Sequence, residues 1–212
     1  MKAFWRYAFV LLVAWPVMLF WLGLNVRHRD RLVAGGPAIV AANHNSHLDT
    51  LALLTLFPLE LIPRIRPVAA ADYFMKPGFM AWFSTNVVGI IPVVRDGRAG
   101  RDPLGECYAA LERGEILIIF PEGSRGEAER MTEFKSGIAH LAARFPHVPV
   151  LPVFMHGTGK SMPRGTFAPV PFFIDIFVGE PLVWSGTRES FMSRLRETFD
   201  ALRAELHAPE YT

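Results

Sequence analysis

A polar loop, Asn43–Asp49, directly follows a short apolar run and contains a histidine and an aspartate separated by four residues. A carboxylate bonded to one imidazole nitrogen fixes the tautomer of the ring, so the other nitrogen can accept a proton. Histidine also suits general-base catalysis near neutral pH. His44 and Asp49 are therefore candidates for a catalytic pair. Two alternatives stay open at this point: Asp49 could only cap a helix starting at Thr50, or His44, His47 and Asp49 could bind a metal.

A second polar loop, Pro121–Glu133, follows another apolar run and suits a phosphate group. An arginine gives a bidentate fork, glycine lets backbone N–H groups approach an anion, and a helix that opens nearby adds anion affinity. An arginine after the apolar run 90–94 could point to the same place. The alternative is an ordinary polar turn with a solvated ion pair and a surface arginine. The candidate residues are Arg95, Glu122, Gly123, Ser124, Arg125 and Lys135.

Short β-rich runs alternate with helical stretches from residue 32 onward, which predicts an α/β domain with a largely parallel central sheet flanked by helices. In such sheets, chemistry gathers in loops at the carboxyl ends of strands, where both polar loops fall. The predicted strands are 38–42, 67–70, 90–94, 115–120, 150–155 and 172–178, and the predicted helices are 51–57, 77–86, 103–113, 135–145 and 188–206.

Composition excludes several classes of protein. The 212 residues are 51% apolar with a net charge of +2, which excludes an intrinsically disordered chain. The single cysteine, Cys107, excludes an internal disulfide framework and a cysteine-rich zinc site, and we expect it to be packed within a helix. Residues 32–212 carry a slight acidic excess, so we expect no nucleic-acid partner. We expect neither a metal nor a cofactor.

Two enzyme motifs can be set aside. Gly157–Ser161 resembles the end of a Walker A loop, but the motif needs a glycine where Phe154 stands, and Met162-Pro163 interrupts the required helix. No serine lies in a G-x-S-x-G nucleophile elbow. The apolar stretch 73–83 could line an acyl-chain groove or touch a membrane, but we favour packing in the core against the sheet.

The N-terminal segment 1–31 is expected to be a membrane anchor, with residues 32–212 as the domain it holds. Residues 7–26 contain no formal charge, which is enough for about 30 Å of helix, the thickness of a hydrocarbon core. The flanking cations Lys2, Arg6, Arg27, Arg29 and Arg31 can contact anionic headgroups. A cleaved signal peptide is the less favoured alternative. The sequence leaves open whether this helix spans the bilayer or only enters it, because Pro16 could kink it.

Four segments occur in an order that closely resembles the 1-acylglycerol-3-phosphate (lysophosphatidic acid) acyltransferase family, the glycerolipid acyltransferases with an HxxxxD motif. The resemblance covers about half of the chain. It departs from the family at Val94, where an aspartate is frequent, and at Ser124, where a threonine is frequent. The segments are Asn43-His44 to Asp49, Gly89 to Arg95, Phe120 to Arg125, and Val148 to Val153.

The resemblance implies a role for each matching residue. His44 would be the general base and Asp49 its orienting partner. Arg95, Glu122, Gly123 and Arg125 would form the acceptor site, with Ser124 supplying a hydroxyl and Lys135 assisting. The resemblance also implies an α/β domain beside a membrane.

The expected reaction moves an acyl group from acyl-coenzyme A or acyl-acyl carrier protein to the free hydroxyl of a lysolipid. 1-Acylglycerol-3-phosphate is the expected acceptor, giving phosphatidic acid in phospholipid biosynthesis. Other lysophospholipids or a lyso-aminolipid, a non-catalytic membrane lipid-binding protein, and a phosphomonoester hydrolase remain alternatives. The single cysteine and the thioester donor favour the cytoplasmic face of the inner (plasma) membrane.

Overall fold

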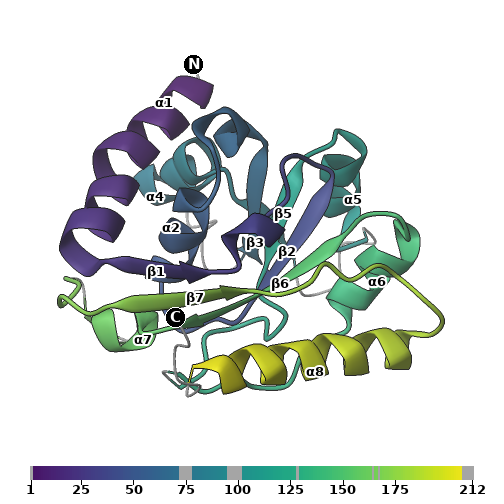
Figure 1. Cartoon of the computed structure of the whole chain (residues 1–212). Helices are drawn as coiled ribbons and strands as arrows, with labels where there is room; N and C mark the ends of the chain where they lie inside the picture. The colour runs from purple at the N-terminus through teal and green to yellow at the C-terminus, as the bar shows by residue number, and fades with distance from the viewer. Residues whose placement is uncertain are drawn as a thin grey trace.

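A seven-stranded sheet lies between two layers of helices (Figure 1). The computed structural model describes residues 2–71, 78–94, 102–127, 129–163, 165–166 and 168–206. The strand order is β1-β7-β6-β2-β5-β3-β4, and neighbouring strands are parallel except β6 and β7. This confirms the predicted α/β class with a largely parallel sheet. The strands are β1 Leu24–Arg27, β2 Ala38–Ala42, β3 Ile65–Ala70, β4 Ile91–Val93, β5 Ile116–Ile119, β6 Val150–His156 and β7 Ile174–Val178.

The core lies on both faces of the sheet, because alternate residues of a strand point to opposite sides. On β2, Val40 packs on one face and Ile39 on the other, and both are fully buried. The first face is covered by α2 Leu48–Thr55 and the N-terminal helix, with α4 Phe79–Phe83 beside them (Figure 1). The second face is covered by α5 Gly105–Glu112, α6 Gly137–Arg144 and α8 Arg188–Glu205. Short helical turns complete the fold: η3 Arg29–Arg31, η4 Leu59–Arg64, η5 Ser84–Val88 and α7 Thr158–Ser161.

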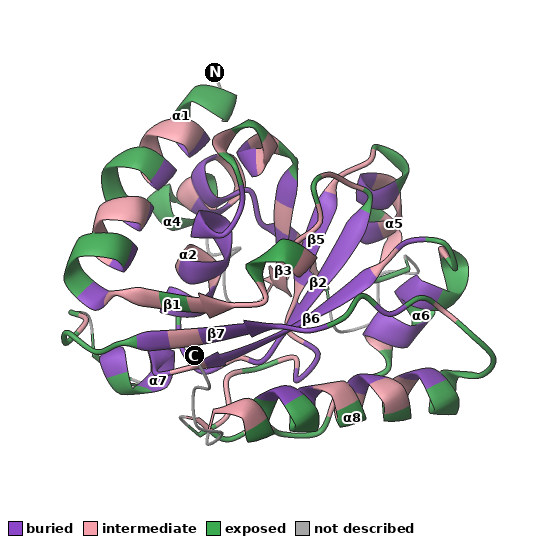
Figure 2. Ribbon diagram, in the orientation of Figure 1, coloured by how far each residue is buried: buried purple, intermediate pink, exposed green. Residues whose placement is uncertain are grey.

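The N-terminal helix lies along the domain instead of projecting from it. It runs from Ala3 to Leu22 through α1 (Lys2–Phe9), η1 (Val10–Ala14) and η2 (Val17–Leu22), and η1 and η2 have the wider turns of a π-helix. By length and composition it could cross a membrane. One stripe is nevertheless buried against the domain, and the opposite side is exposed (Figure 2). Every fourth residue belongs to the buried stripe: Arg6, Val10, Ala14, Met18 and Leu22.

Arg6 is not available to lipid headgroups, and the expectation that it contacts them is wrong. Its side chain is 4% exposed, and its guanidinium donates hydrogen bonds to the carbonyl oxygens of Pro63 (2.8 Å), Ile65 and Val88 (3.1 Å). Gly89 lies against it, where an added Cβ would stand 2.5 Å from the guanidinium carbon. The arginine thus fastens the start of the N-terminal helix to η4, β3 and η5.

Two further segments differ from the sequence prediction. Residues 24–26 were included in the charge-free helix, but Gly23, at φ 74°, ends that helix and the chain continues as β1, which pairs with β7. Part of the predicted anchor segment therefore extends the sheet. The predicted burial of the 73–83 stretch is wrong for Phe79 and Met80, which are 73% and 60% exposed, whereas residues 73–77 lie outside the described residues.

Candidate active site

The two polar loops meet at one edge of the sheet. Strands β2, β5 and β6 are neighbours and parallel, so their carboxyl ends lie together. The loop after β2 carries His44 and Asp49, the loop after β5 carries Glu122 to Arg125, and β6 leads into α7. This arrangement brings together side chains that are almost 80 residues apart in the sequence.

His44 and Asp49 form a hydrogen-bonded pair. The distance from His44 Nδ1 to Asp49 Oδ2 is 2.9 Å, and the same oxygen accepts hydrogen bonds from the backbone N–H groups of Asn45 (2.6 Å) and Ser46 (2.8 Å). Asp49 is fully buried, whereas the His44 side chain is 18% exposed. Because an ionised carboxylate only accepts, Nδ1 carries the proton and the Nε2 lone pair is available for a substrate proton. The pair has the geometry of a general base with its orienting partner.

Asp49 does not act only as a helix cap. Helix α2 begins at Leu48, and Asp49 lies in its first turn, with its carboxylate turned back onto the loop before the helix. The ring of Phe120, at the end of β5, stacks on the His44 imidazole with 4.0 Å between the ring centroids. Asp49 and Phe120 together fix the orientation of the His44 imidazole.

Asn43 and Asn45 attach the loop to the neighbouring strand β6. The Asn43 side chain accepts from the N–H of Met155 (2.7 Å) and donates to its carbonyl oxygen (2.8 Å). Asn45 donates to the same carbonyl oxygen at 3.0 Å. Both asparagines are buried. The two asparagines beside His44 therefore form hydrogen bonds with backbone groups of β6, which explains why polar side chains are buried there.

Glu122 joins the two polar loops. It is 3% exposed, and its Oε1 accepts a hydrogen bond from the backbone N–H of His44 at 2.9 Å. Its Oε2 accepts from the backbone N–H (2.7 Å) and the hydroxyl (2.9 Å) of Thr132. The structure thus places this predicted acceptor-site residue within the scaffold beneath His44, with both carboxylate oxygens bonded to protein groups.

The other predicted residues of the second loop lie nearer the surface. Gly123 has a φ of 73°, and an added Cβ would stand 2.9 Å from Cδ of Lys135, so glycine allows the lysine to cross the loop. Arg125 is half-buried, while Ser124 and Lys135 are exposed. Burial, followed by the charges of Arg125 and His44, lowers the pKa of His47. The positive charge of Arg125 therefore reaches the loop that carries His44.

Arg95 lies outside the described residues, which resume at residue 102. The strand before it in the sequence, β4, is parallel to β3, and β3 is parallel to β5. The carboxyl end of β4 therefore faces the same edge of the sheet as the two polar loops. Among the described residues, no group of three or more histidine, cysteine, aspartate or glutamate side chains could hold a metal ion.

Sequence reasoning missed a second acid–histidine pair at this edge. His156 Nδ1, at the end of β6, lies 2.9 Å from Oε2 of Glu129, and His156 Nε2 lies 3.1 Å from the ammonium nitrogen of Lys160. Glu129 also accepts hydrogen bonds from the backbone N–H groups of Gly157 (3.1 Å) and Gly159 (2.9 Å). No motif marks this pair, because its partners come from different loops.

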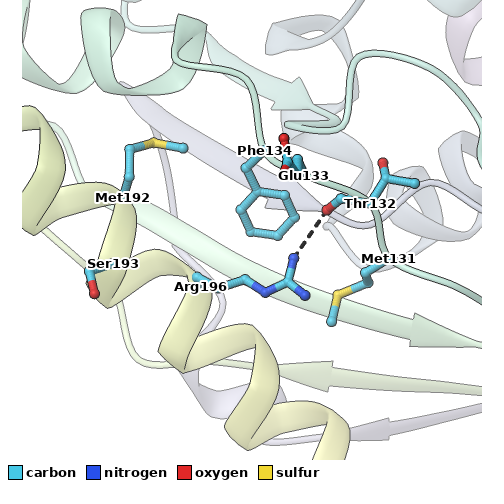
Figure 3. Close-up of a pocket in the computed structure, with 7 residues that line it drawn as sticks. All are labelled: Met131, Thr132, Glu133, Phe134, Met192, Ser193 and Arg196. Atoms are coloured by element: carbon cyan, nitrogen blue, oxygen red, sulfur yellow. Dashed lines mark hydrogen bonds between the residues drawn. The ribbon is translucent and has the colours of Figure 1, made fainter.

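A groove of about 750 Å³ lies between α8 and residues 131–134 (Figure 3). Arg196, from α8, points across it and donates a hydrogen bond to the carbonyl oxygen of Thr132 at 3.0 Å. His44 and Asp49 do not line this groove. Thr132, however, both lines the groove and donates the two hydrogen bonds that hold Oε2 of Glu122. Its lining is Met131, Thr132, Glu133, Phe134, Met192, Ser193 and Arg196.

Comparison of the sequence with known proteins gives one consistent family. The sequence model of the family described as Acyltransferase matches residues 23–156, which contain both polar loops. The chain is 34% identical over 145 residues to the chloroplastic 1-acyl-sn-glycerol-3-phosphate acyltransferase LPAT1 of Arabidopsis thaliana, covering 68% of this chain and 38% of that protein. It is 33% identical over 162 residues to the N-acylphosphatidylethanolamine synthase of Arabidopsis thaliana, covering 70% and 56%.

Comparison of the fold agrees with the sequence comparison. The structure of the 1-acyl-sn-glycerophosphate acyltransferase PlsC from Thermotoga maritima matches with a TM-score of 0.75 and 20% identity, covering 99% of this chain and 81% of that one. The chain spans little more than a third of the length of LPAT1 and about half of that of the synthase. The matched region contains the paired His44 and Asp49 and also the second polar loop. The chain therefore belongs to the acyltransferase family.

Proposed function

We propose that this chain is an O-acyltransferase that moves a fatty acyl group from a thioester to the free hydroxyl of a lysolipid, with 1-acylglycerol-3-phosphate as the acceptor. The observation that carries the proposal is the His44–Asp49 pair, which engages Nδ1 of a partly exposed His44 and leaves its Nε2 for a substrate proton. The names of the relatives support the reaction class and this acceptor. The donor is acyl-coenzyme A or acyl-acyl carrier protein, since both present a thioester.

His44 would act as the general base. Its Nε2 takes the proton of the acceptor hydroxyl while that oxygen attacks the thioester carbonyl carbon, forming a C–O bond. The tetrahedral intermediate then breaks its C–S bond, and the leaving thiolate takes the proton from the imidazolium. The Asp49 carboxylate stabilises the imidazolium between the two steps. No covalent acyl-enzyme is required, so the reaction needs no nucleophilic side chain.

Cationic side chains would bind the phosphate of the acceptor. Arg125 and Lys135 lie near the surface of the second loop, and Arg95 follows a strand that ends at the same edge of the sheet. Gly123 and Ser124 would contribute a backbone N–H and a hydroxyl. Glu122 would act indirectly, by holding the backbone of His44. These roles agree with the positions of the residues and with the resemblance to the family.

The N-terminal segment 1–31 would hold the domain on the membrane that supplies the lysolipid. The helix 3–22 exposes large apolar side chains, with Leu12 75% and Phe20 89% exposed. It ends next to the catalytic edge: Leu24, the first residue of β1, lies beside Ile174 of β7, and Asp175 lies beside His156 of β6. An acceptor taken from the bilayer would therefore enter close to His44. We propose the cytoplasmic face of the plasma membrane as the location, because thioester donors are made in the cytoplasm.

The test is a thioester-consumption assay with the purified chain in detergent micelles, using each donor with a panel of lysolipids. We expect turnover with 1-acylglycerol-3-phosphate and a loss of at least about 10²-fold for His44→Ala, because general-base catalysis contributes about 10²–10⁴-fold. Near-wild-type turnover of a folded His44→Ala variant would contradict the assignment of the base. Phosphate release without any thioester would indicate a phosphomonoester hydrolase instead.

A second acceptor deserves a place in the panel because of one specific relative. The similarity to an N-acylphosphatidylethanolamine synthase favours an amine-bearing phospholipid as the alternative. Faster turnover with that lipid than with 1-acylglycerol-3-phosphate would leave His44 assigned as the base and would change only the assigned acceptor. Lipid binding without thioester consumption would indicate a non-catalytic lipid-binding protein.

A further inference from the structure

The carboxylate of Glu129 lies where three segments of the catalytic edge meet. Oε1 accepts from the backbone N–H groups of Gly157 and Gly159, in the turn after β6. Oε2 accepts from Nδ1 of His156 at 2.9 Å and lies 3.4 Å from Nδ2 of Asn45, the residue next to His44. The Glu129 side chain is 13% exposed. One side chain of the second loop is thus bonded to the β2 loop and to the β6–α7 turn.

The surroundings favour the charged form of Glu129. Burial by itself would raise its pKa, but the hydrogen bond and the electrostatic attraction from His156, followed by the hydrogen bonds from Gly157 and Gly159, outweigh burial and lower the pKa. Glu129 also has a positive φ of 61°, a conformation that is unfavourable for a residue with a Cβ. Its bonds to the other two segments oppose that cost. Gly157–Ser161, the segment that resembles a phosphate loop, thus directs two of its backbone N–H groups to an anion from within the chain.

The hydrogen bonds of His156 have a defined direction. The Lys160 ammonium can only donate, so His156 Nε2 accepts and Nδ1 carries the proton that is donated to Glu129. His156 is therefore a donor to a charged acceptor, and charge-assisted hydrogen bonds of this kind are stronger than those between two neutral groups. This gives Glu129 a fixed partner on β6, the strand that also holds Asn43 and Asn45.

The second loop is then held at both ends. Near its start, Glu122 accepts the backbone N–H of His44, and near its end Glu129 reaches Asn45 and the β6–α7 turn. Arg125 lies between these two attachments. We propose that Glu129, with His156 as its hydrogen-bond donor, is a positioning residue that sets the second loop, and with it the cation of Arg125, in place for the phosphate of the acceptor. This inference rests on the proposed function, because it assigns a substrate-binding consequence to the loop.

Glu127 provides a matched control in the same loop. It is 77% exposed, and its ion pair joins Arg130, only three residues away, at 2.8 Å. Glu127→Gln removes the same charge as Glu129→Gln without touching another segment. The amide of Glu129→Gln would turn a donor toward either the glycine N–H groups or His156, so one set of contacts is lost while the volume stays the same.

Steady-state kinetics of the full chain in detergent micelles tests the proposal. We expect Glu129→Gln to raise the acceptor KM about tenfold or more, because small misplacements of binding groups are costly, while the donor KM and kcat change by less than about threefold. Glu127→Gln should match the wild type. Equal behaviour of the two variants, or equal effects on both KM values, would overturn the proposal.

Variants of His156 separate positioning from a general loss of stability. His156→Asn keeps an N–H near the position of Nδ1 and should retain most of the acceptor affinity, whereas His156→Ala should resemble Glu129→Gln. Should Glu129→Gln fail to fold, this pair still decides the question. Identical acceptor KM values for His156→Asn and His156→Ala would contradict the positioning role of Glu129 and His156.

A readout that needs no activity distinguishes failure of this inference from failure of the proposed function. Hydrogen–deuterium exchange should be faster in Glu129→Gln than in Glu127→Gln for peptides covering 121–134 and 156–161. Faster exchange in a chain without acyl transfer would retain the structural link and reject the reaction. Normal exchange in an active chain would reject the link alone.

Discussion

The two oxygens of Asp49 have different surroundings, and this decides what a substitution should do. Oδ2 accepts all three hydrogen bonds, whereas Oδ1 is buried without a partner among the described residues. An asparagine can therefore place its oxygen at Oδ2 and keep the tautomer of His44. What it loses is the negative charge that stabilises the imidazolium. We expect Asp49→Asn to lower kcat by about 10- to 1,000-fold, since removal of an opposite charge weakens a base by about one to three pKa units.

The measurement for Asp49→Asn is kcat at saturating donor and acceptor, with circular dichroism to verify folding. The predicted loss should exceed any change in the acceptor KM, because Asp49 stabilises a charge that forms only during the reaction. A kcat within threefold of the wild type would show that the orientation of His44 is sufficient and that the charge is not needed.

The thiol of Cys107 should be inert in the folded chain. Cys107 is fully buried in α5, and burial, followed by the nearby Glu106 and Asp102, raises its pKa to about 12. Only the thiolate reacts with alkylating and disulfide reagents, so almost no reactive form is present at pH 8. We expect no labelling by a maleimide or a chromogenic disulfide at pH 8, and full labelling in denaturant. Rapid labelling of the native chain would contradict the packing of α5.

At this scale the sequence identifies the catalytic candidates but not their supports. His44 and Asp49 are close in the chain, so their spacing predicts the pair. Glu122 is found by its motif, although its bonds to His44 and Thr132 could not be inferred from the sequence. Glu129 and His156 are 27 residues apart and belong to loops whose approach depends on the strand order. Long-range hydrogen bonds of this kind leave no local pattern.

Among the elements, the N-terminal helix depends on one buried cation. Arg6 donates to three carbonyl oxygens from η4, β3 and η5, so Arg6→Met would leave buried acceptors without donors. Unpaired buried acceptors cost about 1–3 kcal/mol each, and we expect the free energy of unfolding to fall by about 3 kcal/mol or more.

The control for Arg6→Met is Arg64→Met, an exposed arginine of the neighbouring η4, which should change the stability by less than about 0.5 kcal/mol. Thermal unfolding in detergent micelles, followed by circular dichroism, measures both. Equal melting temperatures for the two variants would mean that the helix is held by apolar contacts alone.

Most strands of the body follow from apolar runs, and their predicted positions agree with the structure to within about two residues. β1 was missed because Leu24 and Val26 continue the apolar composition of the helix before them. Only the partner strand β7 distinguishes them, and that pairing joins segments about 150 residues apart. Likewise, hydrophobicity alone could not distinguish a buried helix from α4, whose Phe79 and Met80 are exposed. A surface of exposed apolar side chains has the same composition as a core.

At the scale of the whole molecule, exposed apolar side chains gather along the N-terminal helix and beside it. Trp5 contacts Trp82 of α4, Trp21 donates a hydrogen bond to the carbonyl oxygen of Pro169, and the exposed Phe173 lies against Gly23 at the end of the helix. Isolated apolar residues on a surface are ordinary, but a contiguous patch marks an interaction site. We therefore propose that the helix lies in a membrane interface, with its apolar side inserted by about 5–10 Å, as amphipathic helices with such a stripe do.

Membrane binding should therefore depend on the exposed stripe of the helix. We expect Leu12→Glu combined with Phe20→Glu to abolish co-sedimentation with phospholipid vesicles, because both side chains point away from the domain. Val183→Glu, a comparably apolar but 47% exposed position after β7, is the control and should bind like the wild type. Undiminished binding of the double variant would assign the membrane surface to another part of the molecule.

The orientation of the helix can be decided by labelling its two ends. A helix lying in the interface keeps both ends on one side of a vesicle, whereas a spanning helix separates them by the bilayer. Ala3→Cys and Asn25→Cys place thiols at exposed positions near the two ends, and the buried Cys107 should contribute little background. When each variant is bound to preformed vesicles, a membrane-impermeant maleimide added outside should label both positions fully, because the stripe from Arg6 to Leu22 is packed on the domain. Protection of one position, released by detergent, would require this stripe to leave the domain and cross the bilayer.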